Sequence, residues 1–142
     1  MKKHIPVWAA VAALALAAGA VSQTAAGPKH HVIVEMSEPQ GPAWGELLVH
    51  VNNLVANFVQ DGGIQVEVVF LGPGLNMLRK TNTADDMRLR HLAEYGVSFL
   101  ACQNSMGAMH LNTEDLFPFV SEVRSGVAEI VRKQEAGWSY LH

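Results

Sequence analysis

The stretch "IQVEVVFLG" (residues 64–72) decides the fold class of this 142-residue chain. Its β-branched residues favour a strand, and Val66, Val68 and Val69 make that strand too apolar for a sheet with one face in water. Strands of this kind belong to parallel sheets that helices cover on both sides. We therefore expect a buried strand of a parallel sheet, followed by a turn at Gly72.

The preceding segments predict the same architecture. "HHVIVEM" (residues 30–36) is a second strand-like run with a β-branched centre. Between the two runs, apolar residues recur at i, i+3, i+4 and i+7 over residues 42–60, which is typical of an amphipathic helix, and Pro42 suits its first turn. Strand, helix and strand at this spacing form a right-handed βαβ unit with parallel strands.

The rest of the chain repeats this alternation. We predict a single α/β domain, a doubly wound parallel sheet of about five strands with helices on both faces. The fifth strand is not assigned to a particular segment. The expected elements are a helical turn at 75–79, helices at 83–95 and 103–111, strands at 97–102 and after Pro118, and a last helix that Ser125 caps and Gly137 ends.

The N-terminal residues predict export. Lys2 and Lys3 precede an uncharged Ala/Leu/Val run over residues 5–20, which ends in a small-residue cleavage site. The run is short and Ala-rich for a spanning helix. We predict a signal peptide at 1–20, with cleavage after residue 26 as the alternative, a flexible lead-in at 21–29 and the domain at 30–142. The expected location is the periplasm, with no membrane association after cleavage.

Charge and motif content argue against several function classes. Loss of the two N-terminal lysines leaves eight basic and thirteen acidic residues, without a Lys/Arg run, so we expect no nucleic-acid partner. The histidines lack metal-ligand spacing, and no dinucleotide fingerprint, Walker loop or Gly-x-Ser-x-Gly motif is present. We therefore predict no metal and no cofactor.

Cys102 is the single cysteine of the chain. In an exported protein it has no internal disulfide partner. It ends the strand at 97–102, where parallel sheets bind their ligands, and a helix capped by Asn104 or Ser105 is expected to follow. A helix start favours the thiolate. Buried cysteines are nevertheless common and mostly inert, so position alone leaves a reactive and a structural role open.

A second candidate site lies at the ends of the three predicted strands. The Gly72-Pro73-Gly74 turn either presents backbone amides to an anion or only connects two elements. Ser37 and Asn104 follow the neighbouring strands. The alternative function is therefore a non-catalytic oligomeric binding module, with a pocket at these residues for a small anion or the tail of a partner protein.

Three segments resemble the DsrE/DsrF-like family of small sulfur-relay-like proteins. They are "LACQNSM" (residues 100–106), "FLGPGLNML" (70–78) and the closing "GVAEIVRKQEAGWSYLH" (126–142). The resemblance implies a doubly wound parallel sheet and assembly into trimers or hexamers. It also implies that Cys102 accepts sulfur as a persulfide and passes it to a partner protein.

This resemblance leads to the functional prediction of an exported sulfur-transfer or persulfide-carrier protein. Cys102 is the reactive group, and the amides of Asn104, Ser105 and Met106 hold the developing charge. The better-studied sulfur-relay subunits are cytosolic and carry an Arg-Gly pair shortly after the cysteine. This chain has Met106-Gly107-Ala108 there, so tRNA thiolation is not expected. A homo-oligomer and a sulfur donor or acceptor protein are the expected partners.

The aromatic runs at 116–119 and 138–140 bear on the expected oligomer. These aromatic side chains either form the interface of the oligomer or pack over the core at the edge of the sheet.

Overall fold

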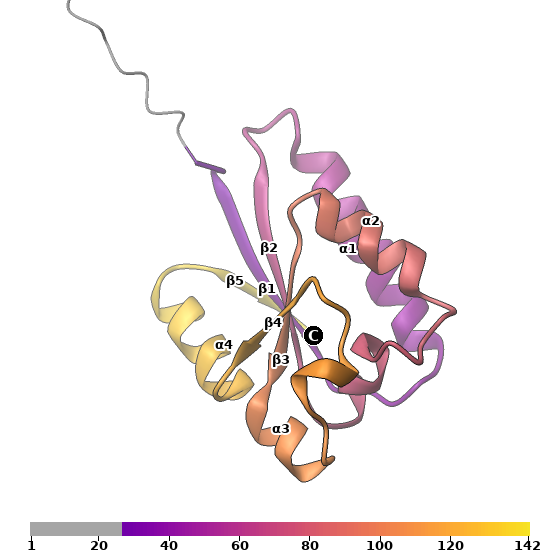
Figure 1. The fold of residues 1–142 in the computed structure, drawn as a ribbon. Coiled ribbons are helices and arrows are strands. Elements are labelled where there is room, and N and C mark those ends of the chain that lie inside the picture. Colours follow the sequence, from indigo (N-terminus) through magenta and orange to yellow (C-terminus); the bar gives the residue numbers. More distant parts are fainter. Residues whose placement is uncertain (1–26) are drawn as a thin grey trace, which may run out of the picture.

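The computed structural model describes residues 27–142, so the predicted signal peptide lies outside the described residues. Five parallel strands form one sheet in the order β4-β3-β2-β1-β5 (Figure 1). The predicted α/β fold with a parallel sheet is confirmed. The strands are β1 (His30–Met36), β2 (Ile64–Phe70), β3 (Ser98–Cys102), β4 (Val120–Val123) and β5 (Ser139–Leu141).

Helices cover both faces of this sheet. Figure 1 shows α1 and α2 side by side on one face, α4 on the other, and α3 beyond the carboxyl end of β3. Two 3₁₀ helices, η1 and η2, occupy the connections after β2 and α3. The helices are α1 (Pro42–Phe58), η1 (Gly72–Leu78), α2 (Asp86–Glu94), α3 (Gln103–Ala108), η2 (Thr113–Asp115) and α4 (Gly126–Glu135).

The strand β2 is buried on both of its faces. Val66, Val68 and Phe70 belong to the large apolar cluster under α1 and α2, whereas Val69 belongs to a smaller cluster under α4. Successive side chains of a strand point to opposite faces, so β2 carries buried apolar side chains on both faces. The buried Glu67 lies on the same face as Val69. The prediction from residues 64–72 is confirmed.

The fifth strand was not assigned from the sequence. β5 pairs with β1 through Val32 with Ser139 and Val34 with Leu141, and two of its three residues are exposed. A three-residue edge strand carries too little apolar pattern to be recognised. Its position follows from α4, which leads the chain back across the sheet to β1.

The aromatic runs close the core. Phe117 is buried and stacks on Phe119, with ring centroids 5.3 Å apart. Trp138 and Tyr140 pack against the smaller cluster under α4. Both runs therefore pack against the core.

Helix ends differ from expectation mainly at α3, which stops at Ala108 rather than residue 111. His110 there adopts a positive φ of 54°, which ends the helical path. The expected Ser125 cap of α4 is present, because its hydroxyl accepts a hydrogen bond from the Ala128 N–H at 3.4 Å. Gly137, with a φ of 88°, follows the end of α4 as predicted.

Candidate functional site

Cys102 joins β3 directly to α3. Its extended backbone makes it the residue before the first helical position, Gln103, so Asn104 and Ser105 lie inside the helix. The prediction that one of them caps α3 is wrong, because no connecting residue separates strand from helix and no side chain caps it. The Ser105 hydroxyl instead accepts a hydrogen bond from the Gly72 N–H at 3.0 Å.

The sulfur of Cys102 also faces the start of α4. The Gly126 N–H donates to Sγ at 3.2 Å, and Gly126 is the first residue of that helix. A Cβ at this position would overlap the side chain of Leu71 and lie 2.9 Å from Cγ2 of Val69. Glycine is therefore needed for α4 to approach the thiol this closely. The starts of two helices meet at one sulfur atom.

The pKa of the Cys102 thiol lies below its ordinary value. Burial, the largest single influence, raises this pKa, but four hydrogen bonds lower it and together outweigh burial. They come from the Gly126 N–H, the Ser105 N–H and hydroxyl, and the Asn104 N–H. Oriented donors of this kind favour the charged form of an acid. The surroundings of the sulfur therefore stabilise a thiolate.

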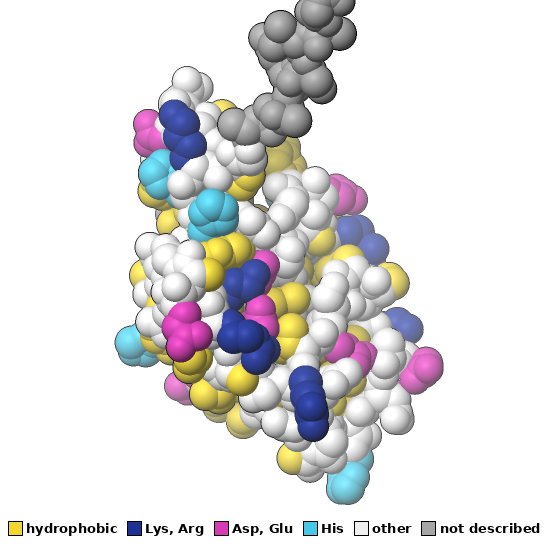
Figure 2. Space-filling model, turned by 90° about the vertical axis from the view of Figure 1, so that its left-hand side faces the viewer, with side chains coloured by type: hydrophobic (Ala, Val, Ile, Leu, Met, Phe, Trp, Pro, Cys, Tyr) yellow, Lys and Arg dark blue, Asp and Glu magenta, His cyan; other side chains and the backbone are white. Residues whose placement is uncertain are grey.

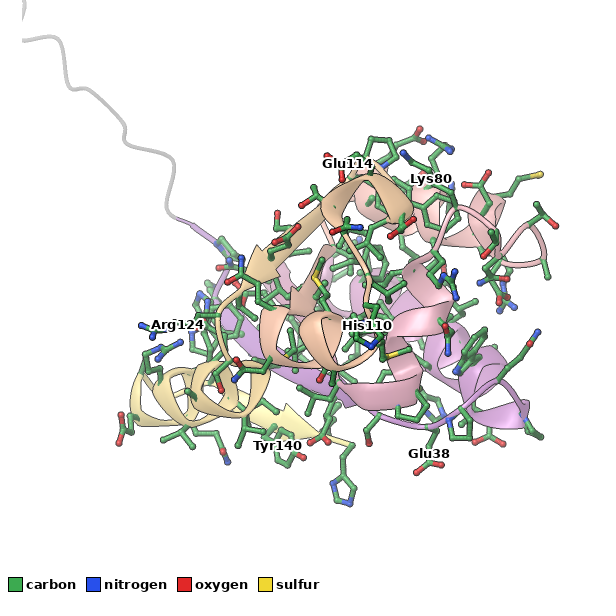
Figure 3. The ribbon with its side chains drawn as sticks, turned by 60° about the horizontal axis from the view of Figure 1, so that its bottom comes forward. Glu38, Lys80, His110, Glu114, Arg124 and Tyr140 are labelled. Carbon is green, nitrogen blue, oxygen red and sulfur yellow. The ribbon has the colours of Figure 1, made fainter. Side chains whose placement is uncertain are left out.

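Access to this sulfur is restricted. The Cys102 side chain is 3% exposed. Figure 3 looks onto the carboxyl ends of the strands, where Arg124 marks the chain just before α4 and His110 the turn after α3. Cys102 lies at the start of α3 and touches the start of α4, so a reactant must displace part of one of these two elements.

The other predicted site residues divide into two groups. Asn104 and Ser105 donate hydrogen bonds to the thiol, whereas the Gly72 amide bonds to the Ser105 hydroxyl instead. Pro73 is exposed, Gly74 packs against the Met36 carbonyl, and Met106 is buried in the large core cluster. Ser37 lines a different hollow of about 330 Å³, bordered by α1, β1 and β5, to which neither Gly72 nor Asn104 contributes.

Three polar residues beside α3 were missed. Glu122 in β4 accepts hydrogen bonds from Gln103 Nε2 at 2.9 Å and from Thr113 Oγ1 at 2.6 Å. These bonds, that from Thr113 first, hold the pKa of the Glu122 carboxyl below its usual range. Glu122 pairs in register with Ala101, so the cluster lies next to Cys102. No local sequence pattern indicates it, because the three residues come from separate elements.

Comparison with known protein families identifies the family of this chain. The profile of the DsrE/DsrF-like family matches residues 29–142. This chain belongs to the DsrE/DsrF-like family. No curated protein matches the chain significantly.

Solved structures share this DsrE/DsrF-like fold. The protein of unknown function MTH1491 from Methanobacterium thermoautotrophicum is 32% identical, with a TM-score of 0.73 over 78% of this chain and 96% of its own. The ychN protein from E. coli is 10% identical, with a TM-score of 0.61 over 79% and 97%. BT1422 from Bacteroides thetaiotaomicron, also of unknown function, is 10% identical, with a TM-score of 0.62 over 78% and 92%. The last two similarities concern the fold alone.

Within residues 27–142, His, Cys, Asp and Glu side chains form no group of three or more that could hold a metal ion. Among the same residues, no helix combines the length and the apolar character needed to span a bilayer.

Proposed function

We propose that this protein carries sulfur as a persulfide on Cys102. The observation that carries the proposal is the convergence of backbone amides and the Ser105 hydroxyl on Sγ, which lowers the thiol pKa. The thiolate is the nucleophilic form of cysteine. Membership of the DsrE/DsrF-like family is a second support.

The proposed uptake step is a sulfur transfer without net oxidation. The Cys102 thiol first loses its proton, and its thiolate attacks the outer sulfur of a donor persulfide. The Sγ–S bond forms while the donor S–S bond breaks, and the electron pair leaves on the donor thiolate. The amides that hold the thiolate then face the negative charge of the new persulfide.

Release to an acceptor reverses the roles. An acceptor thiolate attacks the outer sulfur of the Cys102 persulfide, and Cys102 leaves as a thiolate. A thiol of low pKa is a good leaving group, so the same hydrogen bonds favour both steps. Because Cys102 is 3% exposed, each step requires the start of α4 or α3 to move aside.

The second candidate function is a non-catalytic binding module for a small anion or a partner protein. The burial of Cys102 favours it, because a shielded thiol behaves as a small apolar core residue. The two functions differ in the reactivity of the native thiol.

Sulfur uptake distinguishes them. Wild-type protein incubated with a low-molecular-weight persulfide is expected to gain one sulfur atom on Cys102 by intact mass spectrometry. Cys102→Ser, which is nearly the same size, should keep the fold and gain none. Native alkylation by iodoacetamide should show an apparent pKa below the roughly 8.5 of free cysteine.

Failure of this test has a distinct signature. Absence of sulfur on the wild-type protein, together with alkylation that becomes ordinary only on unfolding, would leave the binding module as the function.

We also propose export through the N-terminal signal peptide, supported by the basic start and the apolar run at 5–20. Protein recovered from the periplasm should begin between residues 21 and 27. Recovery of an intact N-terminus from the membrane fraction would contradict export.

Homo-oligomerisation, as a trimer or hexamer, is a further proposal. It is supported by two exposed large side chains beside grooves between α1 and α2, namely Met87 on α2, 83% exposed, and Tyr95 just after α2, 66% exposed. Light scattering at micromolar concentration should give three or six times the protomer mass, and a monomer would contradict it.

A further inference from the structure

A second hollow opens at the carboxyl end of the sheet, away from the thiol. It measures about 390 Å³ and lies between the start of α1 and the segment that follows η1. Amides and hydroxyls dominate its lining, and Arg79 is the one charged side chain among its lining residues. The polar side chains around Arg79 are Gln40, Asn76, Thr81, Asn82 and Thr83.

The guanidinium of Arg79 is incompletely bonded. A guanidinium has five N–H donors, and here Nη1 donates to Asn76 Oδ1 at 3.2 Å, whereas the buried Nε has no acceptor. Among residues 27–142, the salt bridges involve other cations, and no carboxylate pairs with Arg79. A buried donor without an acceptor is unfavourable. The hollow therefore holds a positive charge without a counter-ion.

The walls around this charge are held in place by their own hydrogen bonds. Asn82 Nδ2 donates to the Met77 carbonyl at 2.9 Å and to Asp85 at 3.1 Å, so the nearby carboxylate is engaged by an amide rather than by Arg79. The Trp44 indole N–H donates to the Glu38 carbonyl at 3.0 Å. Among residues 27–142, no hydrogen bond engages the hydroxyl of Thr81 or Thr83, so both remain available as donors.

We propose that this hollow binds a small oxyanion, with Arg79 as its anchor. The planar guanidinium matches the paired oxygens of a carboxylate, a sulfate or a phosphate, and the neighbouring hydroxyls and amides add neutral donors. The ligand is either an inorganic oxyanion or the carboxylate of a small metabolite. The chemistry of recognition is the same for both.

This anion site is separate from the sulfur site. The start of η1 touches Ser105 through Gly72, and Arg79 follows its last residue. Seven residues at the rise of a 3₁₀ helix span roughly 14 Å, so an anion on Arg79 does not contact the thiol. The proposal therefore stands whether or not Cys102 carries sulfur.

The test is an NMR titration of ¹⁵N-labelled protein with sulfate, phosphate and succinate in separate arms. Saturable shifts are expected for the Trp44 indole N–H and the Arg79 Nε–H. The Trp138 indole, which packs under α4 on the opposite face, should not respond. Saturation by sulfate or phosphate identifies an inorganic ligand, and saturation by succinate alone a carboxylate. Both results support the site.

Two variants and two controls complete the experiment. Arg79→Gln removes the anchor, and Asn76→Asp keeps Arg79 but supplies it with an internal carboxylate; each should weaken binding at least tenfold. Arg124→Gln, at an exposed arginine elsewhere, and Cys102→Ser should bind as wild type. Absence of saturable shifts with all three anions, or unchanged affinity in both Arg79→Gln and Asn76→Asp, would overturn the proposal.

Discussion

The two faces of the sheet are buried in different ways. Under α1 and α2 the cluster is large and apolar, and Val68, Phe70 and Leu89 have no exposed surface. Under α4 only four buried apolar residues form the cluster, with Leu71, Val123, Trp138 and Tyr140 partly buried around them. The four residues are Ile33, Val69, Leu100 and Ile130.

Charges supplement the thinner α4 face. Lys133 on α4 binds the buried Glu67 at 2.6 Å, and its ammonium group lies 4.0 Å from the centre of the Trp138 ring. Figure 2 shows basic and acidic side chains gathered on the side of the molecule that carries α4. The helix α4 also supplies the Gly126 N–H that contacts Cys102. The helix that shields the thiol is therefore the one that packs on the smaller apolar cluster. We expect α4 to open before α1 and α2.

The largest effect should come from the α1 and α2 side. Val68→Asp places a carboxylate without a partner in the apolar cluster and should cost at least about 3 kcal/mol of unfolding free energy. Chemical denaturation measures it. Val127→Asp, at an α4 position that is 61% exposed, is the matched control and should change stability by less than about 0.5 kcal/mol. If Val68→Asp melts close to wild type, the assignment of this face as the main core is wrong.

An intermediate effect is expected from the charge pair under α4. Lys133→Met leaves Glu67 buried without its cation and should destabilise the protein by about 2 kcal/mol, less than a fully buried pair would. Iodoacetamide should then reach Cys102 faster, because α4 opens more often.

Two further variants test that interpretation. Arg90→Met removes an exposed ion pair of α2, with Asp86, and should cost less than about 0.5 kcal/mol without changing the alkylation rate. The double variant Glu67→Leu, Lys133→Met should recover most of the lost stability. Faster unfolding of Lys133→Met without faster alkylation would show that α4 does not control access to the thiol.

The smallest effect concerns the thiol itself. Ser105→Ala removes a hydroxyl that lowers the Cys102 pKa, so this pKa should rise. The Gly72 N–H also loses its acceptor, which should cost about 1 kcal/mol of stability. Because the folded pKa lies below the unfolded value, wild-type stability increases as the pH rises from the folded pKa towards the unfolded one, and this contribution is lost as the pH falls through the folded pKa. In Ser105→Ala this pH dependence should be shallower.

The pH dependence of alkylation measures the pKa, and thermal melts across the same pH range measure the stability. An unchanged alkylation pKa in Ser105→Ala would mean that the backbone amides alone set the acidity of the thiol.

Much of the fold was predictable because its signals are local. Runs rich in β-branched residues predicted β1 and β2, helical periodicity predicted α1, and Ser125 was recognised as the cap of α4. The position of Cys102 at the end of a strand followed from the same patterns. Each of these features depends on residues within about one helical turn or one strand of each other.

The tertiary structure alone decided the contacts at the two candidate sites. Gly126 reaches Cys102 across 24 positions of sequence, and Gly72 reaches Ser105 across 33. The unpaired charge of Arg79 appears only when the start of α1 closes over the segment after η1. Such contacts join residues that lie far apart in the sequence and have independent local patterns. Apolar periodicity determines which face of each element is buried. It does not determine which polar atoms meet when the elements pack together.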